Sequence, residues 1–495
     1  MKPLSQRRSA PFLGLVLLLL WPSLGQALPP SGLTFPALEF HPPQAEEIRL
    51  DNGMRLYLME DHELPLINLT ARIRTGSIYE PLDKVGLAEI FGTVMRTGGT
   101  VHRTPEEINE TLEYIAASVE TRVSREYATA TLSVLKEDLD TGLEIFADVL
   151  MHPAFREDKI RLKQQQMIEE IRRRNDNPTQ IAMREFAALL YGRTHPYGRY
   201  EEVETVLNVT REDLLDFHRR YYHPNNLWLA ASGDFQREDL IARLQRVFAG
   251  WEPAEIEFPA LPPVSERYER TVNCVAKGVN QSTIFVGHLG ITRHSPDRIP
   301  FEVLNFILGG SGLTSRLMRE VRSRQGLAYS VGSFYTLRDD LGLFVAYSLT
   351  RAEATVKALR LMLEILQRIR EEPVSEEELR VAKDSLINSY VFDFDSSHKI
   401  ATQQMALDYF GYPDNWLITY PDKVAAVTKE DLLRVAQKYL RPAEATILVV
   451  GEAEKFSESL AAFGEVHTIV LKEPPPLPVR GEQPSRPRLR LRKKG

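Results

Sequence analysis

The sequence predicts an α+β protein made of two homologous domains, each a mostly antiparallel sheet with helices packed on one side and related by internal duplication. The 495 residues exceed the length of one ordinary domain, and 43% hydrophobic with 26% charged residues is typical of folded proteins. Segment 206–215 (VLNVTREDLL) recurs at 424–433 (VAAVTKEDLL). The constant offset of 218 residues also aligns Tyr221 with Tyr439, Pro224 with Pro442 and Gly233 with Gly451.

Each copy of the repeat predicts the same local structure. Thr210 and Thr428 are expected to cap a helix that ends near a proline, and an apolar strand at 227–231 or 445–450 then leads to a glycine turn. In the first half, strands are predicted at 54–58 and 67–73 and helices at 105–118, 135–151 and 156–175. In the second half, a strand is predicted at 343–349 and a helix at 352–371.

The first 27 residues have the pattern of a secretory signal peptide, with basic residues, an apolar run at 12–21 and a small-residue exit at Ala27. The run is shorter than the ~20 residues of a membrane-spanning helix, and no second run reaches that length. We therefore expect cleavage after Ala27 and a soluble periplasmic protein, with an uncleaved anchor as the alternative. Because no cysteine follows the run, a lipoprotein anchor is not expected.

The composition along the chain predicts its further divisions. An N-terminal extension at 28–44 precedes the domains at 45–255 and 269–472, which a Pro- and Glu-rich linker at 256–268 joins. Residues 473–495 form a Pro-rich basic tail that we expect to be disordered. The tail is either a solubilising end or an electrostatic arm for weak contact with a membrane surface or an acidic partner.

The net charge and the cysteine count exclude several classes of function. The net charge is −7 although both chain ends are basic, so the body is acidic and nucleic acid is not an expected partner. The single cysteine, Cys274, excludes an internal disulfide framework, a cysteine-based zinc finger and an iron–sulfur cluster.

Several short segments together resemble the pitrilysin/insulinase metallopeptidases, and most closely the smaller two-domain members of the mitochondrial processing peptidase type. They are LDNG at 50–53, Gly76-Ser77 before GLA at 86–88, HPYG at 195–198, YHPNN at 222–226, SRL at 315–317 and Arg322 before GLAY at 326–329. The resemblance covers nearly the whole mature chain and implies the duplicated fold. It also implies a place for the family's inverted zinc motif, H-x-x-E-H.

The residues at the zinc motif positions depart from the family pattern. Glu89 stands where the family has the first histidine, Gly92 where it has the catalytic glutamate and Thr93 where it has the second histidine. The third ligand, a glutamate seven residues before another acid, corresponds to Lys163, or to Leu162 if the register slips by one.

These replacements remove the chemistry of a zinc peptidase. An ammonium group repels a cation, and one carboxylate cannot replace the three protein ligands of a catalytic zinc. The resemblance thus implies no catalytic residue in the N-terminal domain, no metal or other cofactor in this chain, and no activity for the chain alone. Zinc is expected only in an active partner subunit.

The second half retains a different part of the family's machinery. Arg322 and Tyr329 match an Arg/Tyr pair that, in the family, binds the substrate carbonyl and stabilises the tetrahedral intermediate. The alternative is that Arg322 is a solvated helix residue and Tyr329 a core strand residue. The glycines Gly309, Gly310 and Gly312 form either a turn before a helix or, as in the processing-peptidase type, a loop that contacts substrate.

The histidine spacing gives no further site, because the pairs His218/His223 and His288/His294 do not stack on one helical face. Our main hypothesis is a non-catalytic subunit of a periplasmic zinc metallopeptidase heterodimer. Its partner is a homologous subunit that carries H-x-x-E-H, and its substrate is a peptide. A stand-alone peptide-binding or scaffold protein is the first alternative, and an active enzyme with unrecognised metal ligands is the second.

Overall fold

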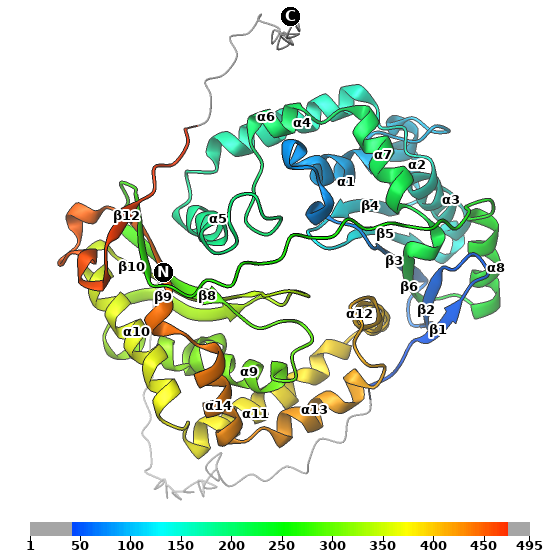
Figure 1. The fold of residues 1–495 in the computed structure, drawn as a ribbon. Helices are drawn as coiled ribbons and strands as arrows, with labels where there is room; N and C mark the ends of the chain where they lie inside the picture. The colour runs from blue at the N-terminus through cyan, green and yellow to red at the C-terminus, as the bar shows by residue number, and fades with distance from the viewer. Residues whose placement is uncertain (1–41, 474–495) are drawn as a thin grey trace, which may run out of the picture. The chain divides into compact units, whose positions relative to one another are not determined.

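The computed structural model describes residues 42–473 (Figure 1). Every described residue belongs to one compact unit. The predicted signal peptide, nearly all of the N-terminal extension and the basic tail lie outside the described residues. Within the described part, no helix combines the length and apolar character needed to cross a membrane.

The first half contains a six-stranded sheet in the order β1-β2-β6-β3-β5-β4. Strand β2 pairs in parallel with β6, and every other pairing in the sheet is antiparallel, as predicted. The strands are β1 (Glu46–Arg49), β2 (Arg55–Glu60), β3 (Leu66–Ile73), β4 (Ser118–Val123), β5 (Ala128–Leu135) and β6 (Leu227–Gly233).

The second half repeats this topology in the order β12-β7-β11-β8-β10-β9. Strands β7 and β11 form the parallel pair that corresponds to β2 and β6. Only the edge strand differs, because β1 precedes β2 along the chain whereas β12 comes from the end of the described chain and runs parallel to β7. The strands are β7 (Thr271–Ala276), β8 (Gln281–Leu289), β9 (Ala328–Tyr335), β10 (Leu343–Arg351), β11 (Thr446–Gly451) and β12 (Val466–Thr468).

The sequence repeat corresponds to one helix–strand unit in each half. Thr210 caps α7 (Arg211–Tyr221) and Thr428 caps α14 (Lys429–Tyr439). Each threonine forms a capping box with the aspartate three residues later, so two of the free N–H groups at the start of the helix are satisfied. β6 and β11 then follow at equivalent positions, as the offset predicted.

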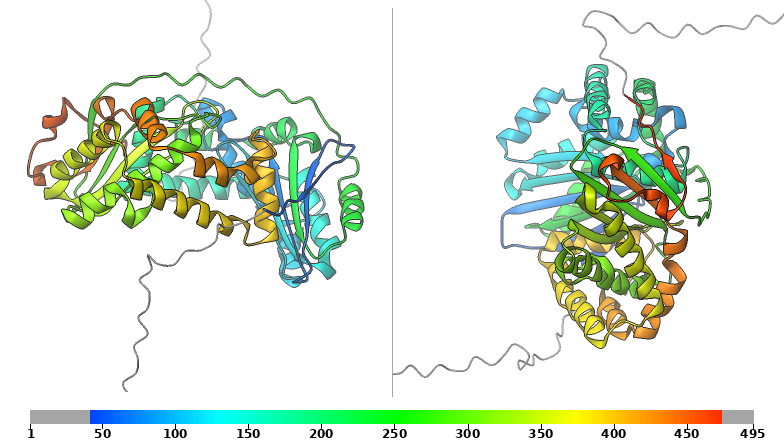
Figure 2. Two further views of the ribbon diagram at one scale, coloured as in Figure 1. Left: turned by 90° about the horizontal axis from the view of Figure 1, so that it is seen from below. Right: turned by 90° about the vertical axis from the view of Figure 1, so that its left-hand side faces the viewer.

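Each sheet is covered by helices of its own half on one face and by one exchanged helix on the other. α1 (Leu87–Thr97) and α3 (Leu139–Met151) pack on the first sheet, whose opposite face holds α12 (Ser397–Tyr409) from the second half (Figures 1 and 2). In the same way α5 (Pro178–Tyr191) of the first half packs on β8 and β11 of the second sheet. The exchange explains why the central strands β6 and β11 are buried at every residue.

A carboxylate in α12 ties the exchanged helix to the first sheet. Asp408 Oδ2 accepts hydrogen bonds from Arg55 Nη1 at 2.7 Å, from the Tyr57 hydroxyl at 2.7 Å and from Trp228 Nε1 at 2.6 Å. Burial alone would raise the pKa of Asp408, but these three donors outweigh burial and lower it. The charged carboxylate therefore stabilises the contact between the two halves.

Two of the predicted helix boundaries are wrong at the junctions with strands. The helix predicted at 105–118 ends as α2 (Pro105–Tyr114), because Ala116 adopts a φ of 51° and β4 begins at Ser118. The helix predicted from residue 135 begins at residue 139, because Leu135 is the last residue of β5. Residues 251–270, which include the predicted linker, contain neither helix nor strand. The other helices are α4 (Glu157–Arg173), α6 (Val203–Leu207), α8 (Arg237–Val247), α9 (Arg298–Asn305), α10 (Thr355–Glu371), α11 (Glu376–Tyr390) and α13 (Trp416–Ala426).

Candidate functional site

Glu89 and Lys163, two of the four predicted degenerate positions, form an ion pair. Glu89 lies in the first turn of α1, Lys163 lies in α4, and the two helices pack against each other. Lys163 Nζ donates to Glu89 Oε1 at 2.7 Å. The lysine side chain is 12% exposed and the glutamate side chain 43%. The neighbouring Leu162, the alternative in the sequence, is an exposed residue.

Gly92, the third of these positions, has no room for a side chain. A Cβ atom built on Gly92 would lie 2.5 Å from the backbone nitrogen of Val123 in β4, a distance that real Cβ atoms essentially never show. The hydroxyl of Thr121 donates to the Gly92 carbonyl at 2.6 Å and holds the same contact from the strand side. Thr93, the fourth position, is half-buried. A glutamate at position 92 would therefore require β4 to move away from α1.

The side chains at these positions do not suit a zinc ion. They supply one carboxylate, one hydroxyl and no imidazole, whereas a catalytic zinc takes three nitrogen, sulfur or carboxylate ligands from the protein. The one carboxylate already accepts from an ammonium group. The ammonium group of Lys163 thus already lies beside the Glu89 carboxylate. A metal cation at this place would be repelled by that positive charge.

Carboxylates with raised pKa values surround the N-terminus of α1. Burial raises the pKa of Glu80 to about 8, although its Oε1 accepts from the Ala88 N–H at 2.6 Å. Burial also raises the pKa of Glu201, and the negative charge of Glu89 adds to this effect. Glu89, Glu170 and Glu201 line a cavity of 450 Å³ beside the ion pair. The sequence did not identify Glu80 or Glu201, because both come from segments outside the recognised motif.

Arg322 and Tyr329 lie next to each other on the second half. Arg322 belongs to the π-helical segment Met318–Arg324 and Tyr329 to β9. The Arg322 guanidinium carbon is 5.8 Å from the centre of the Tyr329 ring. Tyr329 is 73% exposed, so its interpretation as a core strand residue is wrong. Within residues 42–473 neither side chain forms an ion pair or a hydrogen bond with Glu89 or Lys163.

The three glycines of the second half have different surroundings. Gly309 and Gly310 end the π-helical segment Phe306–Gly310. A Cβ atom on Gly309 would lie 2.3 Å from the backbone nitrogen of Ser333 in β9, so this glycine permits a close helix–strand contact. Gly312 has a φ of +62° and open space around it. This left-handed conformation is typical of a glycine in a turn that is exposed to solvent or to a ligand.

The sequence predicted no metal site at the two histidine pairs, and in the structure one histidine of each pair has a structural role. His288 is buried and His218 is half-buried, and desolvation lowers the pKa of each to about 4. The His218 ring bonds to the Leu150 carbonyl at 2.8 Å, and the His288 ring bonds to the Leu289 carbonyl at 2.8 Å. Each ring therefore serves the core as a neutral imidazole.

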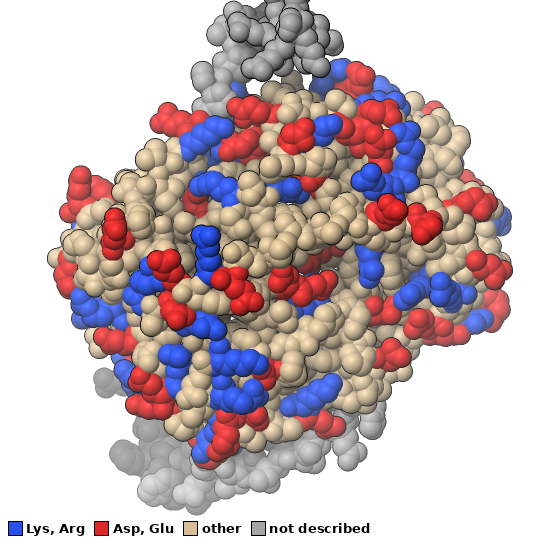
Figure 3. All heavy atoms as spheres, viewed as in Figure 1, with Lys and Arg blue, Asp and Glu red and all other residues tan. Residues whose placement is uncertain are grey.

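A larger cavity of 920 Å³ is lined by residues of both halves and of the segment that joins them. Aromatic and acidic side chains from both halves line it, and Figure 3 shows acidic and basic side chains intermixed over one face of the molecule. No sequence motif predicted this cavity, because its walls come from distant segments. The aromatic and acidic residues are Tyr79, Tyr197, Trp228, Phe258, Tyr409, Phe410, Glu126, Glu255, Asp339, Asp340 and Asp408.

Comparison with family models and curated proteins gives consistent matches. Residues 58–197 match the model of insulinase (peptidase family M16), and residues 208–386 match the model of the peptidase M16 inactive domain. The chain is 28% identical over 345 residues to an uncharacterized zinc protease of Rickettsia felis. The aligned region covers 68% of this chain and 81% of that protein. It is 26% identical over 349 residues to the uncharacterized zinc protease YmxG of Bacillus subtilis, with 70% and 84% covered.

Solved structures share the fold over most of the chain. A peptidase M16 inactive domain from Pseudomonas fluorescens superposes with a TM-score of 0.76 and 25% identity, over 83% of this chain and 98% of that chain. A protease from Helicobacter pylori gives a TM-score of 0.73 at 20% identity, over 83% and 100%. The periplasmic protease PqqL from Escherichia coli gives 0.71 at 14% identity, over 82% of this chain and 45% of that chain.

Proposed function

The chain belongs to the pitrilysin/insulinase (M16) family of metallopeptidases, and from this membership we propose that it is the non-catalytic subunit of a periplasmic zinc metallopeptidase heterodimer. The partner is a homologous subunit with H-x-x-E-H, which holds the zinc and the general base. This chain completes the peptide chamber and contributes Arg322 and Tyr329. The periplasmic location rests on the signal-like pattern of residues 1–27.

One observation carries the proposal. At the positions that the resemblance aligns with the zinc motif, Glu89 and Lys163 pair at 2.7 Å and Gly92 leaves no space for a glutamate side chain. A chain with these contacts needs a second subunit to supply metal and base. The match of residues 208–386 to the inactive-domain model also supports a non-catalytic subunit.

The chemistry of Arg322 and Tyr329 suits a contribution to a partner's active site. A guanidinium and a phenol can both donate hydrogen bonds to the oxyanion that develops during peptide hydrolysis, and neither needs a metal to do so. Tyr329 is exposed, and Arg322 forms no ion pair with any residue of the described chain that would hold it back. Gly312, with open space around it, lies on the same half and is available to an extended peptide.

A specific observation favours the alternative, a stand-alone peptide-binding protein. The 920 Å³ cavity between the halves combines aromatic walls with carboxylates and with the guanidinium groups of Arg55 and Arg74, a mixed lining that suits an extended peptide with aromatic and polar side chains. In this alternative the same chain binds peptide without hydrolysis and needs no partner.

Peptidase activity on a quenched fluorescent peptide separates these functions. We expect no activity from the chain alone and activity when it is mixed with an H-x-x-E-H homologue from the same organism. Arg322→Ala or Tyr329→Phe should lower kcat of the mixture by about 10²-fold, the usual effect of losing one oxyanion donor. Arg324→Ala and Tyr114→Phe are matched controls, because Arg324 bonds Glu320 and Tyr114 is 91% exposed on the first half.

The other outcomes have definite meanings. Zinc-dependent hydrolysis by the chain alone would contradict the proposal. An inactive mixture, together with micromolar peptide binding by the chain alone, would favour the stand-alone binding protein. Activity of the mixture that neither substitution lowers would retain the heterodimer but remove the assigned role of the Arg/Tyr pair.

A further inference from the structure

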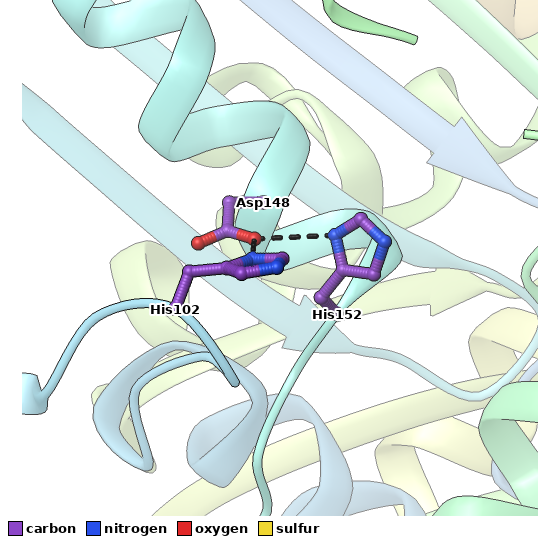
Figure 4. A group of neighbouring side chains, drawn as sticks. All are labelled: His102, Asp148 and His152. Carbon is purple, nitrogen blue, oxygen red and sulfur yellow. Dashed lines mark hydrogen bonds and ion pairs between the residues drawn. The ribbon is translucent and has the colours of Figure 1, made fainter. Parts of the chain in front are cut away.

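A second cluster of ligand-type side chains lies in the first half, outside the positions discussed above. His102 lies in the loop that follows α1, Asp148 lies in the last turn of α3, and His152 is the C-cap residue of α3 (Figure 4). Each residue directs one ligand atom toward the others, and the three atoms lie within 4.8 Å of one another. We propose that His102, Asp148 and His152 form a binding site for one zinc ion.

The distances fit three ligands of one metal ion. Asp148 Oδ1 is 2.6 Å from His102 Nδ1 and 3.2 Å from His152 Nδ1. Ligand atoms about 2.1 Å from a tetrahedral zinc are themselves about 3.4 Å apart. To admit the ion, the two Asp148–imidazole distances therefore have to lengthen by less than an ångström, while the ligand nitrogens of His102 and His152, which lie within 4.8 Å of each other, have to reach a similar separation.

The two oxygens of Asp148 have separate roles. Oδ1 faces the two imidazoles, whereas Oδ2 accepts from Thr100 Oγ1 at 2.5 Å and from Arg103 Nη1 at 3.3 Å. Supporting bonds of this kind orient a metal-binding carboxylate. Arg103 also pairs with Glu144 at 3.2 Å, which partly balances the positive charge next to the site.

Backbone contacts hold the two ligand-bearing segments together. The Val101 N–H donates to the His152 carbonyl at 2.9 Å, and the Ala154 N–H donates to the Gly99 carbonyl at 3.0 Å. Both histidines are therefore placed before any ion arrives, and binding does not have to order a loop. The site also lies at the C-terminal end of α3, where the partial negative charge of the helix favours a cation.

Exposure and ligand type select the metal. Asp148 is buried, but the His102 and His152 side chains are 58% and 42% exposed, so water can complete the coordination on the open side. Two imidazoles and one carboxylate suit zinc and its neighbours, whereas calcium and magnesium prefer oxygen ligands alone. The ion would fasten the 99–103 loop to α3. This inference is independent of the proposed function, because it uses none of the peptidase positions.

Calorimetric titration with Zn²⁺ tests the site on the chain from residue 28 onward, after EDTA treatment and removal of the chelator. We expect one equivalent of zinc per chain, at least tenfold weaker binding in His102→Gln and in His152→Gln, and a rise in Tm with zinc in the parent protein only. Both imidazoles are exposed, so these variants should fold. Co²⁺ in place of zinc should give a visible absorption band that both variants lose.

Two control variants locate the bound ion. His62→Gln alters another exposed histidine, which pairs with Asp234 and Glu60 outside the cluster, and this variant should bind zinc like the parent protein. Glu89→Gln alters the peptidase position and should also leave zinc binding unchanged. The proposal is overturned if the parent protein binds no zinc, if both histidine variants bind it as tightly as the parent, or if only Glu89→Gln weakens binding.

Discussion

The ion pair between Glu89 and Lys163 allows a quantitative test of how the predicted degenerate zinc position is stabilised. We consider Glu89→Ala, Lys163→Met and the double variant. At 2.7 Å, two unit charges attract by about 1.5 kcal/mol in water and about 6 kcal/mol at an effective dielectric constant of 20. Desolvation of the nearly buried ammonium offsets much of the larger value. We therefore expect a coupling free energy of about 1–2 kcal/mol.

The different exposure of the two partners predicts an asymmetry between the single variants. Glu89→Ala leaves an ammonium that is only 12% exposed without its partner, which should cost about 2–3 kcal/mol. Lys163→Met leaves a carboxylate that is 43% exposed and open to water, which should cost less than about 1 kcal/mol. Loss of the favourable charge near the start of α1 occurs in Glu89→Ala and in the double variant alike, so it cancels in the cycle.

Urea unfolding followed by tryptophan fluorescence measures each free energy of unfolding. The pair Arg380–Asp384 serves as control, because its atoms are 3.0 Å apart on one exposed helix face and its coupling should be only about 0.3–0.5 kcal/mol. A coupling for Glu89–Lys163 no larger than that of the control would refute the reasoning. A Lys163→Met variant less stable than Glu89→Ala would refute it as well.

Three further changes test other contacts. Asp408→Ala should lower the free energy of unfolding by about 3–5 kcal/mol in urea titrations, because the buried Tyr57 hydroxyl and Trp228 indole lose their acceptor. The folded pKa of Glu80, about 8, exceeds the unfolded value of about 4.3, so its proton stabilises the fold at low pH and this contribution is lost as pH rises from about 4.3 to 8. Glu80→Gln should remove that loss, and its stability relative to the parent protein should therefore be greater at pH 8.5 than at pH 5. Gly92→Glu should destabilise the chain by about 1–3 kcal/mol in the same titration and give no peptidase activity, since its Cβ would lie 2.5 Å from the backbone of β4.

The repeat let the sequence predict much of the fold, because capping and strand patterns are local. Thr210 and Thr428 cap equivalent helices, and the strands after them occupy equivalent places in the two sheets. The errors lie where helix and strand propensities meet. Ala116 takes a left-handed conformation and ends the helix predicted to reach residue 118, and no residue pattern marks such a break.

The sequence did not predict that α5 and α12 each pack on the sheet of the other half. Both helices have apolar residues, but the pattern does not tell which sheet they cover. The three donors that meet Asp408 come from β2 and β6, more than 170 residues away along the chain. A contact of this kind depends on how complete sheets and helices pack.

The sequence by itself determined the duplicated α+β fold and the family, because capping, periodicity and motif spacing are local properties of the chain. Only the tertiary structure decided that Lys163 pairs with Glu89, that a strand closes the space at Gly92, and that Tyr329 is exposed. It also brought His102 to within 4.8 Å of His152, across two helices and two strands of intervening chain. Distances between side chains depend on packing, and packing is a property of the whole folded chain.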